Sequence, residues 1–229
     1  IARTWNDSDA CCNTSSLFTQ VITVHDTKAP LANQTPTQLN VTVQCNNSLG
    51  LSQALSQAPT FTDNCDPTAP PVLQSFVSGQ GTDPQQCSYY NYSITRTWNA
   101  SDACGNVSAL YTQVITVVDN QVPVSLTPAN ALNATIQCDD PAALANFLAL
   151  SPSFSDNCDP DVDADLIFNQ STQGTDPNLC TYYNYTITRK WTATDVCGNT
   201  SAQYTQVITI KDTEVPIVDQ APGALNVAL

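Results

Sequence analysis

The chain has 229 residues, long enough for one large domain or two of ordinary size, and carries a formal net charge of −14. A chain this acidic repels nucleic acid and anionic lipid, because it has no basic patch to offset phosphate charge. Only 11% of its residues are charged, and it contains 15 prolines, one glutamate and no methionine, which favours an all-β extracellular protein over a helical one.

The cysteine content points to an oxidising compartment. Ten cysteines occur without a single CxxC pair, which argues against a zinc ribbon or a thioredoxin-type redox motif. Structural disulfides are the better interpretation, and they predict a secreted protein located outside the cell or at its surface. No run of 18 apolar residues is present, so membrane insertion is not expected. Residue 1 falls inside a repeated motif, so we expect a segment of a longer secreted protein.

An internal repeat organises the chain. Trp5, Trp98 and Trp191 lie 93 residues apart, and four cysteine positions follow the same step. The two full copies align without a gap, with 46 of 93 positions identical. The predicted division is the C-terminal hairpin of a truncated repeat (1–30), two whole repeats (31–123 and 124–216), and the first strand of a following repeat (217–229).

Period-2 alternation of apolar residues predicts the strands of each repeat, which in the first copy are 39–45, 58–65, 72–79, 90–101 and 109–119. The last two strands form a hairpin around the turn ACGN. Between the first two strands, residues 139–150 of the second copy predict one short helix, with Asp140 at the N-cap and Pro141 at the first helical position. The predicted fold is therefore all-β: tandem immunoglobulin-like β-sandwich repeats of 93 residues, each with two disulfides and one short helix.

Four cysteines in a repeat allow three pairings. In an immunoglobulin-like sandwich the second and penultimate strands end at one pole, and the first strand ends at the other. This topology predicts disulfides closed within each repeat, with loops of about 40 residues. The predicted pairs are Cys45–Cys87, Cys65–Cys104, Cys138–Cys180 and Cys158–Cys197.

Cys12 breaks the repeat, since Gly105 and Gly198 occupy the same position in the other copies. The two glycines are expected to adopt a positive φ in the turn, which Cys12 would adopt at some cost. Cys11 is expected to pair with a cysteine that precedes residue 1. Cys12 is then left as a free thiol, a crosslink to another chain, or an error in the sequence.

The motifs TDNCDP, W-x-A-[ST]-D-x-C-G-N and QVITVxDxxxP together resemble the HYR-like repeats of large bacterial surface proteins. The version with four cysteines is similar to repeats of giant adhesins and gliding-motility proteins of Bacteroidota. This resemblance covers the whole chain and implies an immunoglobulin-like fold, a cell-surface location and a role in adhesion or extension. It implies no catalytic residues, and Cys12 departs from its pattern.

Repeated aspartates are the candidate site. Asp26, Asp119 and Asp212 end the last strand of each repeat, and a proline four residues later stiffens the linker. In a head-to-tail array each of these aspartates would approach the acidic turns of the next repeat, and carboxylates with backbone carbonyls suit Ca²⁺. The alternative is that the side chains only cap their turns. The predicted metal ligands are Asp26, Asp63, Asp66 and Asp102 at one joint, and Asp119, Asp156, Asp159 and Asp195 at the next.

Other candidate sites have structural explanations. Arg96 is expected to pair with a carboxylate such as Asp83 and to stack on an aromatic ring. The single histidine, His25, is not repeated, so no repeated histidine chemistry is expected and the chain is not predicted to be an enzyme. Twelve N-x-[ST] motifs weakly indicate glycosylation. Those singled out are Asn91, Asn99, Asn106, Asn184 and Asn199.

These observations predict a structural or adhesive repeat region of a long secreted cell-surface protein, acting as a stiff extracellular stalk or fibre. One alternative is the building unit of an assembled filament, and another is a carbohydrate-binding module of a secreted enzyme. The expected partners are neighbouring repeats of the chain, further copies in a filament, and a surface glycan or protein.

Overall fold

The computed structural model describes residues 1–220, which group into two compact units. Unit 1 comprises residues 1–43, 47–80 and 92–117, and unit 2 comprises residues 44–46, 81–91 and the chain from residue 118 onward. The units therefore do not follow the repeat boundary at residue 124, because residues 44–46 and 81–91 of the first repeat pack with the second. None of the described helices combines the length and the apolar character that a bilayer crossing needs.

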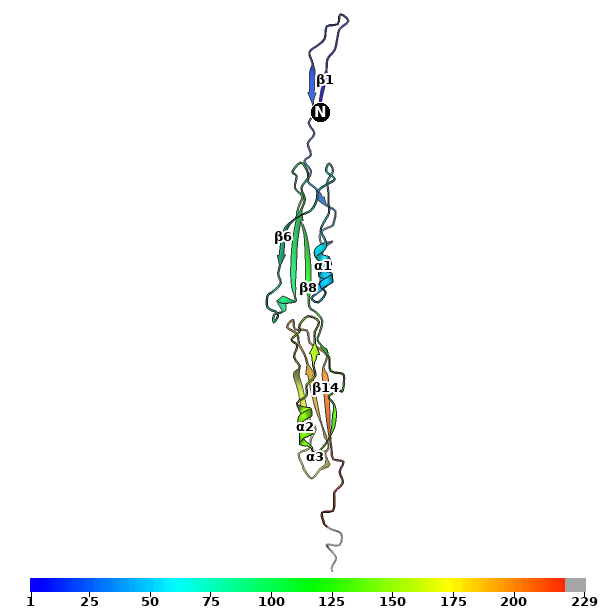
Figure 1. The fold of residues 1–229 in the computed structure, drawn as a ribbon, viewed down its shortest axis with the longest axis vertical. Coiled ribbons are helices and arrows are strands. Elements are labelled where there is room, and N and C mark those ends of the chain that lie inside the picture. Colours follow the sequence, from blue (N-terminus) through cyan, green and yellow to red (C-terminus); the bar gives the residue numbers. More distant parts are fainter. Residues whose placement is uncertain (221–229) are drawn as a thin grey trace, which may run out of the picture. The chain divides into compact units, whose positions relative to one another are not determined.

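The first full repeat is built on a four-stranded sheet with the order β4-β8-β7-β6, accompanied by the two-stranded sheet β3-β5 (Figure 1). Strand β7 is antiparallel to both β6 and β8. The strands are β3 (Leu31–Ala32), β4 (Val41–Gln44), β5 (Phe61–Thr62), β6 (Val72–Ser78), β7 (Tyr92–Asn99) and β8 (Tyr111–Val118), with the helices α1 (Ser48–Ser56) and η1 (Cys87–Tyr89).

The second repeat has the same order, β10-β14-β13-β12 with β11-β9. Strand β10 is parallel to β14, and the other neighbours in the large sheet are antiparallel. The predicted β-sandwich repeats are confirmed. The strands are β9 (Val124–Ser125), β10 (Ala134–Gln137), β11 (Phe154–Ser155), β12 (Asp165–Ser171), β13 (Tyr185–Thr192) and β14 (Tyr204–Lys211), with the helices α2 (Pro141–Leu148) and α3 (Cys180–Tyr183).

The core of each repeat lies on the inward face of the two long central strands. In β7 every second residue is buried, and Trp98 is 3% exposed within a cluster that includes Phe61 and Tyr111. Arg96 lies on the same face, with Cζ 4.5 Å from the centre of the Trp98 ring. Stacking of arginine on an aromatic ring was predicted and is present.

The polar partners of Arg96 differ from the prediction. Its Nη1 donates to the carbonyl oxygen of Gln57 and to Oε1 of Gln113, which is fully buried. Asp83, the predicted partner, instead accepts a hydrogen bond from the N–H of Gln85 in its own turn. Only neutral oxygens accept hydrogen bonds from Nη1, and Nε is buried without a hydrogen-bond partner among the described residues. Burial lowers the pKa of Arg96.

The predicted short helix is confirmed as α2. Pro141 occupies its first turn, and the carboxylate of Asp140 accepts a hydrogen bond from the N–H of Ala143. The apolar side chains of α2 pack beside a buried cluster formed by Ile136, Ile208 and Ile210. The first repeat has a matching helix, α1, capped by Asn47.

Replacing Asp140 by alanine is expected to lower the free energy of unfolding by about 1 kcal/mol, because the N–H of Ala143 loses its acceptor. Asp139→Ala is the matched control, since it removes the same charge from a neighbouring exposed residue that caps nothing in α2. Urea denaturation of both variants measures the difference. Equal losses would contradict the role of Asp140 as the cap.

The strand predicted at 58–65 is shorter than expected, since β5 spans only Phe61–Thr62. Pro59 has no N–H to donate to a neighbouring strand. Directly after β5, the carboxylate of Asp63 accepts a hydrogen bond from the N–H of Cys65, and the chain turns there. The strand predicted over 217–229 falls mostly outside the described residues, and 217–220 form no strand.

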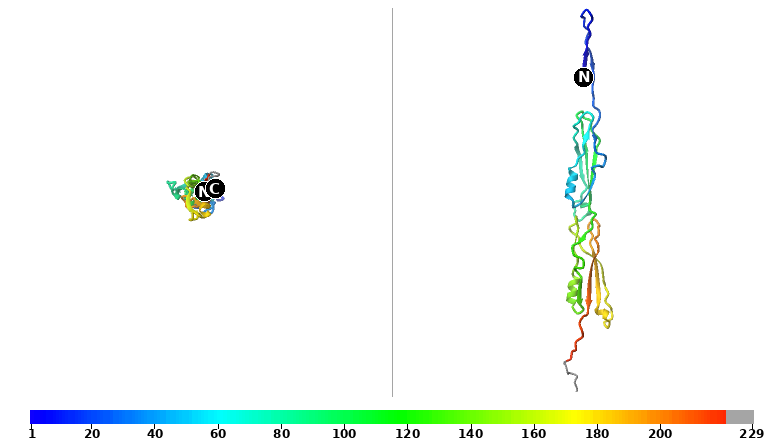
Figure 2. Two further views of the ribbon diagram at one scale, coloured as in Figure 1. Left: turned by 90° about the horizontal axis from the view of Figure 1, so that it is seen from below. Right: turned by 90° about the vertical axis from the view of Figure 1, so that its right-hand side faces the viewer.

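The N-terminal hairpin consists of β1 (Ala2–Trp5) and β2 (Phe18–Val21), which pair only with each other among the described residues (Figure 2). Trp5 is 47% exposed, whereas the equivalent Trp98 is 3% exposed. The difference follows from the missing strands, because in the complete repeats the large sheet has a further strand on each side of this hairpin.

The turn of this hairpin confirms the expected backbone of Cys12. Its φ is 70°, close to the 85° and 87° of Gly105 and Gly198. A Cβ added to either glycine would meet no atom within 4 Å, so a side chain fits and only the backbone conformation is unfavourable.

Cys12→Gly is therefore expected to raise hydrogen-exchange protection of the hairpin amides about tenfold, since the left-handed conformation costs a non-glycine residue about 1–2 kcal/mol. Cys11→Ser is the control, because it removes the adjacent thiol from a residue without a positive φ. No gain in protection over Cys11→Ser would contradict this explanation.

Candidate functional site

Two disulfides link cysteines of different repeats. Cys45 is bonded to Cys158, with a Cα–Cα distance of 6.0 Å, and Cys87 is bonded to Cys197, with a Cα–Cα distance of 4.6 Å. All four residues belong to unit 2. The prediction that each repeat closes its own disulfides is therefore wrong.

The physical reason for this error is the neighbouring repeat. Cys45 follows β4 and Cys87 begins η1, whereas Cys158 and Cys197 lie in the acidic turns after β11 and β13. The prediction treated each repeat as an isolated sandwich, but in a tandem array these turns meet the chain segments 44–46 and 81–91. Within residues 1–220 the remaining cysteines form no disulfide, and these are Cys11, Cys12, Cys65, Cys104, Cys138 and Cys180.

The structure brings together three of the four acids predicted for each joint. In unit 2 one carboxylate oxygen each of Asp119, Asp156 and Asp195 lie within 4.8 Å of one another. The corresponding group in unit 1 is Asp26, Asp63 and Asp102. We call the first group the Asp119 cluster and the second the Asp26 cluster.

The fourth predicted ligand of each set, Asp159 or Asp66, is not part of its group of three, and its role as a metal ligand stays a prediction. Asp159 is 2% exposed, and its Oδ2 accepts a hydrogen bond from the N–H of Val196, which lies in the acidic turn after β13. Oδ2 of Asp66 accepts the N–H of Ala103 in the same way. These carboxylates hold one turn against the other.

Two members of the Asp119 cluster belong to turns that they also cap. Oδ1 of Asp156 accepts the N–H groups of Cys158 and Asp159, and Oδ1 of Asp195 accepts those of Cys197 and Asn199. The capping role considered from the sequence is therefore present. It leaves Oδ2 of Asp156 buried without a hydrogen-bond partner in the described structure.

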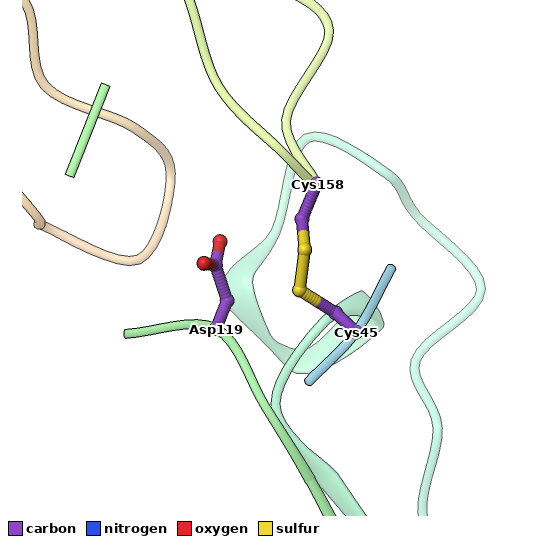
Figure 3. Close-up of side chains that lie close together, drawn as sticks. All are labelled: Cys45, Asp119 and Cys158. Carbon is purple, nitrogen blue, oxygen red and sulfur yellow. A yellow bond between two sulfur atoms is a disulfide. The ribbon is translucent and has the colours of Figure 1, made fainter. Parts of the chain in front are cut away.

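Asp119 differs from its two neighbours. It follows β8, is 4% exposed, and neither of its carboxylate oxygens has a hydrogen-bond partner among the described residues. Its side chain lies beside the Cys45–Cys158 disulfide (Figure 3). Burial, and then the charges of Asp156 and Asp195, raise its pKa to about 6, although the nearby N–H of Gln121, which is not within hydrogen-bond geometry, acts to lower it.

Two asparagines that were predicted only as glycosylation sites hold the backbone of Asp119. Its carbonyl oxygen accepts hydrogen bonds from Nδ2 of Asn91 and Asn199, at 3.5 and 3.4 Å, and Oδ1 of Asn91 accepts its N–H. The signal was available, because Asn91 and Asn199 lie in the repeated motifs YYNY and CGN. Both had been considered only as glycosylation sites.

The side-chain amides of four predicted glycosylation sites donate hydrogen bonds inside the protein. A glycan on the same nitrogen would disturb these contacts, while Asn99 uses its oxygen to accept a bond from Gln74. Glycosylation stays an untested prediction. The four residues with donating amides are Asn91, Asn106, Asn184 and Asn199.

Comparison with known proteins places the chain in a family. The model of the HYR-like domain with 4 cysteines matches residues 33–117 and 126–210. No curated protein matches the chain. Among solved structures, a crystal structure of human protocadherin-24 EC1-2 (form II) matches with 14% identity and a TM-score of 0.31, covering 82% of this chain and all of that one. The chain, with two tandem copies that span most of its length, belongs to the family of HYR-like domains with four cysteines.

Proposed function

We propose that the chain is a structural or adhesive repeat region of a long secreted cell-surface protein, in which successive repeats form a stiff extracellular stalk or fibre. The observation that supports this proposal best is the pair of disulfides Cys45–Cys158 and Cys87–Cys197, each of which bonds one repeat to the next. Such bonds persist in an oxidising environment and resist a pulling force that would otherwise separate the repeats. The stiff linker expected at Pro123 acts in the same direction.

Force spectroscopy of the chain, held at its two ends, tests this role. With the disulfides intact, the shortest covalent path bypasses the segment between Cys45 and Cys158, whose sequence separation is 113. The unfolded oxidised chain should therefore extend about 370–410 Å less than the reduced chain. Disulfides closed within each repeat would hide two 42-residue loops, a shortfall of about 280–300 Å.

A variant with all four bonded cysteines changed to serine is the control, and it should extend fully under oxidising conditions. Equal extension of the oxidised and reduced chains would overturn the mechanical role. Changing only Cys45 and Cys158 should alter the shortfall little, because Cys87–Cys197 still closes 110 residues.

The second candidate, a building unit of an assembled filament, is favoured by the cysteines that form no disulfide within residues 1–220, most of which are exposed. Disulfides between copies would then join subunits. Incubation with a glutathione redox buffer, followed by a non-reducing gel, distinguishes the two functions. A ladder of multiples of 24.5 kDa would support the filament, and a single band would contradict it.

A further inference from the structure

The Asp119 cluster concentrates negative charge, and among residues 1–220 no ion pair with a cation compensates it. Asp119 is 4% exposed and Asp195 is 5% exposed, and their carboxylates lie within 4.8 Å of each other and of Asp156. Three carboxylates at this separation, taken out of water, are strongly unfavourable unless a positive charge joins them. The two buried arginines cannot serve, because Arg96 and Arg189 stack on tryptophans in the cores.

A second observation points to a missing ligand. Both oxygens of Asp119 and Oδ2 of Asp156 are buried and have no hydrogen-bond partner among the described residues. Buried polar atoms in folded proteins almost always have a partner, so three such atoms in one cluster indicate an unfilled position. The oxygens of Asp159, three residues from Asp156, are fully used by backbone N–H groups, which shows that this turn can satisfy a carboxylate when nothing else binds it.

We propose that Asp119, Asp156 and Asp195 bind one Ca²⁺ ion, in a site that the two inter-repeat disulfides preorganise. Carboxylate oxygens are hard ligands, and opposite oxygens around Ca²⁺ are about 4.6–5.2 Å apart, so three oxygens that all lie within 4.8 Å of one another are close enough to share one ion. Mg²⁺ requires near-ideal octahedral geometry with opposite oxygens about 4 Å apart. Asp156 and Asn157 also line a surface hollow of about 250 Å³.

The disulfides act on the ligand turns directly. Cys158 lies two residues after Asp156, and its N–H is bound by that carboxylate; Cys197 and Asp195 have the same relation. Each disulfide therefore ties one ligand turn to the segments 44–46 or 81–91, which pack in the same unit as Asp119. Calcium binding at this site does not depend on the proposed mechanical role of the chain.

Calorimetric titration of the oxidised, chelator-stripped chain with Ca²⁺ tests the proposal. We expect a site with a Kd of about 10⁻⁴–10⁻³ M, the range of extracellular calcium modules, and at least tenfold weaker binding of Mg²⁺. Tb³⁺ emission excited through tyrosine is a second readout. Tyr90 is a suitable donor, because it is buried and belongs to the same unit as Asp119.

Asp119→Asn should abolish this site, and circular dichroism verifies that the variant remains folded. Two controls should retain it: Asp163→Asn, which removes an exposed carboxylate, and Asp26→Asn, which changes the equivalent residue of the other cluster. Reduction of the disulfides should weaken Ca²⁺ binding at least tenfold. The reduced chain is to be compared at a temperature at which it remains folded.

Several outcomes would overturn the proposal. No heat and no Tb³⁺ emission from the oxidised chain, or the same loss in Asp163→Asn as in Asp119→Asn, would remove the site. Equal Mg²⁺ affinity would exclude a calcium site, and unchanged binding after reduction would exclude preorganisation by the disulfides. None of these results affects the predicted shortfall in extension, so the failure of this proposal is distinguishable from the failure of the mechanical role.

Discussion

Removing the Cys45–Cys158 disulfide, by changing both residues to serine, is expected to lower the free energy of unfolding of unit 2 by about 3–5 kcal/mol. The bond closes a segment of 113 residues, and in the chain-entropy model the restriction of the unfolded state grows with the length of the closed loop. A loss of this size corresponds to a fall in Tm of about 10–15 °C for units of this size. Guanidinium denaturation under non-reducing conditions measures it.

The chain offers a matched control for this variant. Cys65 and Cys104 occupy the same repeat positions as Cys158 and Cys197, yet they form no disulfide within the described residues. Changing Cys65 and Cys104 to serine is expected to alter the stability by less than about 0.5 kcal/mol. A comparable loss in both variants, together with a Cys65–Cys104 crosslink in peptide mapping, would restore pairing within the repeat.

The metal-free chain is expected to lose stability as the pH rises from about 4 to about 6, through the ionisation of Asp119. Its pKa in the folded state is about 6, above the ordinary 3.8, so the folded state binds this proton more tightly than the unfolded state does. The favourable contribution is complete below pH 4 and is lost above pH 6. A shift of about two units amounts to about 3 kcal/mol.

Asp119→Asn isolates this contribution, because asparagine stays neutral throughout. In excess chelator the variant should be more stable than the native chain by up to about 3 kcal/mol at pH 7.5, with the difference vanishing near pH 4. The free energy of unfolding of the native chain is to be subtracted from that of the variant at each pH, because Asp63 and Asp66 add a pH dependence of opposite sign. Hydrogen bonds from backbone N–H groups lower the pKa values of these two residues, so their stabilisation is lost below about pH 4.

Asp163→Asn is the control for this experiment, since its exposed carboxylate lies outside the cluster and its removal should leave the pH dependence between 4 and 6 unchanged. Thermal unfolding in chelator across this range provides the measurement. An Asp119→Asn variant that is less stable than the native chain at pH 7.5 would contradict an unpaired buried charge at this position.

Local structure was predictable wherever neighbouring residues decide it. Alternation placed Ile94, Arg96 and Trp98 on the buried face of one strand, and this face is buried. The helix α2 begins where Asp140 and Pro141 indicated, because capping depends on atoms three residues apart. The left-handed turn at Cys12 also followed from the sequence, since glycine occupies the position in both other copies.

The acidic site was predictable only in part. The repeat placed Asp119 near the turns that contain Asp156 and Asp195, and these three residues do lie together. Which acid of the turn DNCD faces Asp119 could not be read from the sequence. That choice depends on which backbone N–H groups each carboxylate binds, and Asp159 binds the N–H of Val196 in the opposite turn.

The amino-acid sequence was enough to establish the 93-residue repeat, the order of strands within it, and the acids and cysteines at its turns. Which cysteines are bonded and which carboxylates share a site became known from the folded structure. The reason is that a repeat without gaps gives equivalent positions the same local sequence: Cys65 in the repeat of Cys45 and Cys158 in the next repeat occupy the same position, and only Cys158 is bonded to Cys45. The choice between them depends on which side chains lie within bonding distance after the repeats pack, and spacing along the chain does not contain this information.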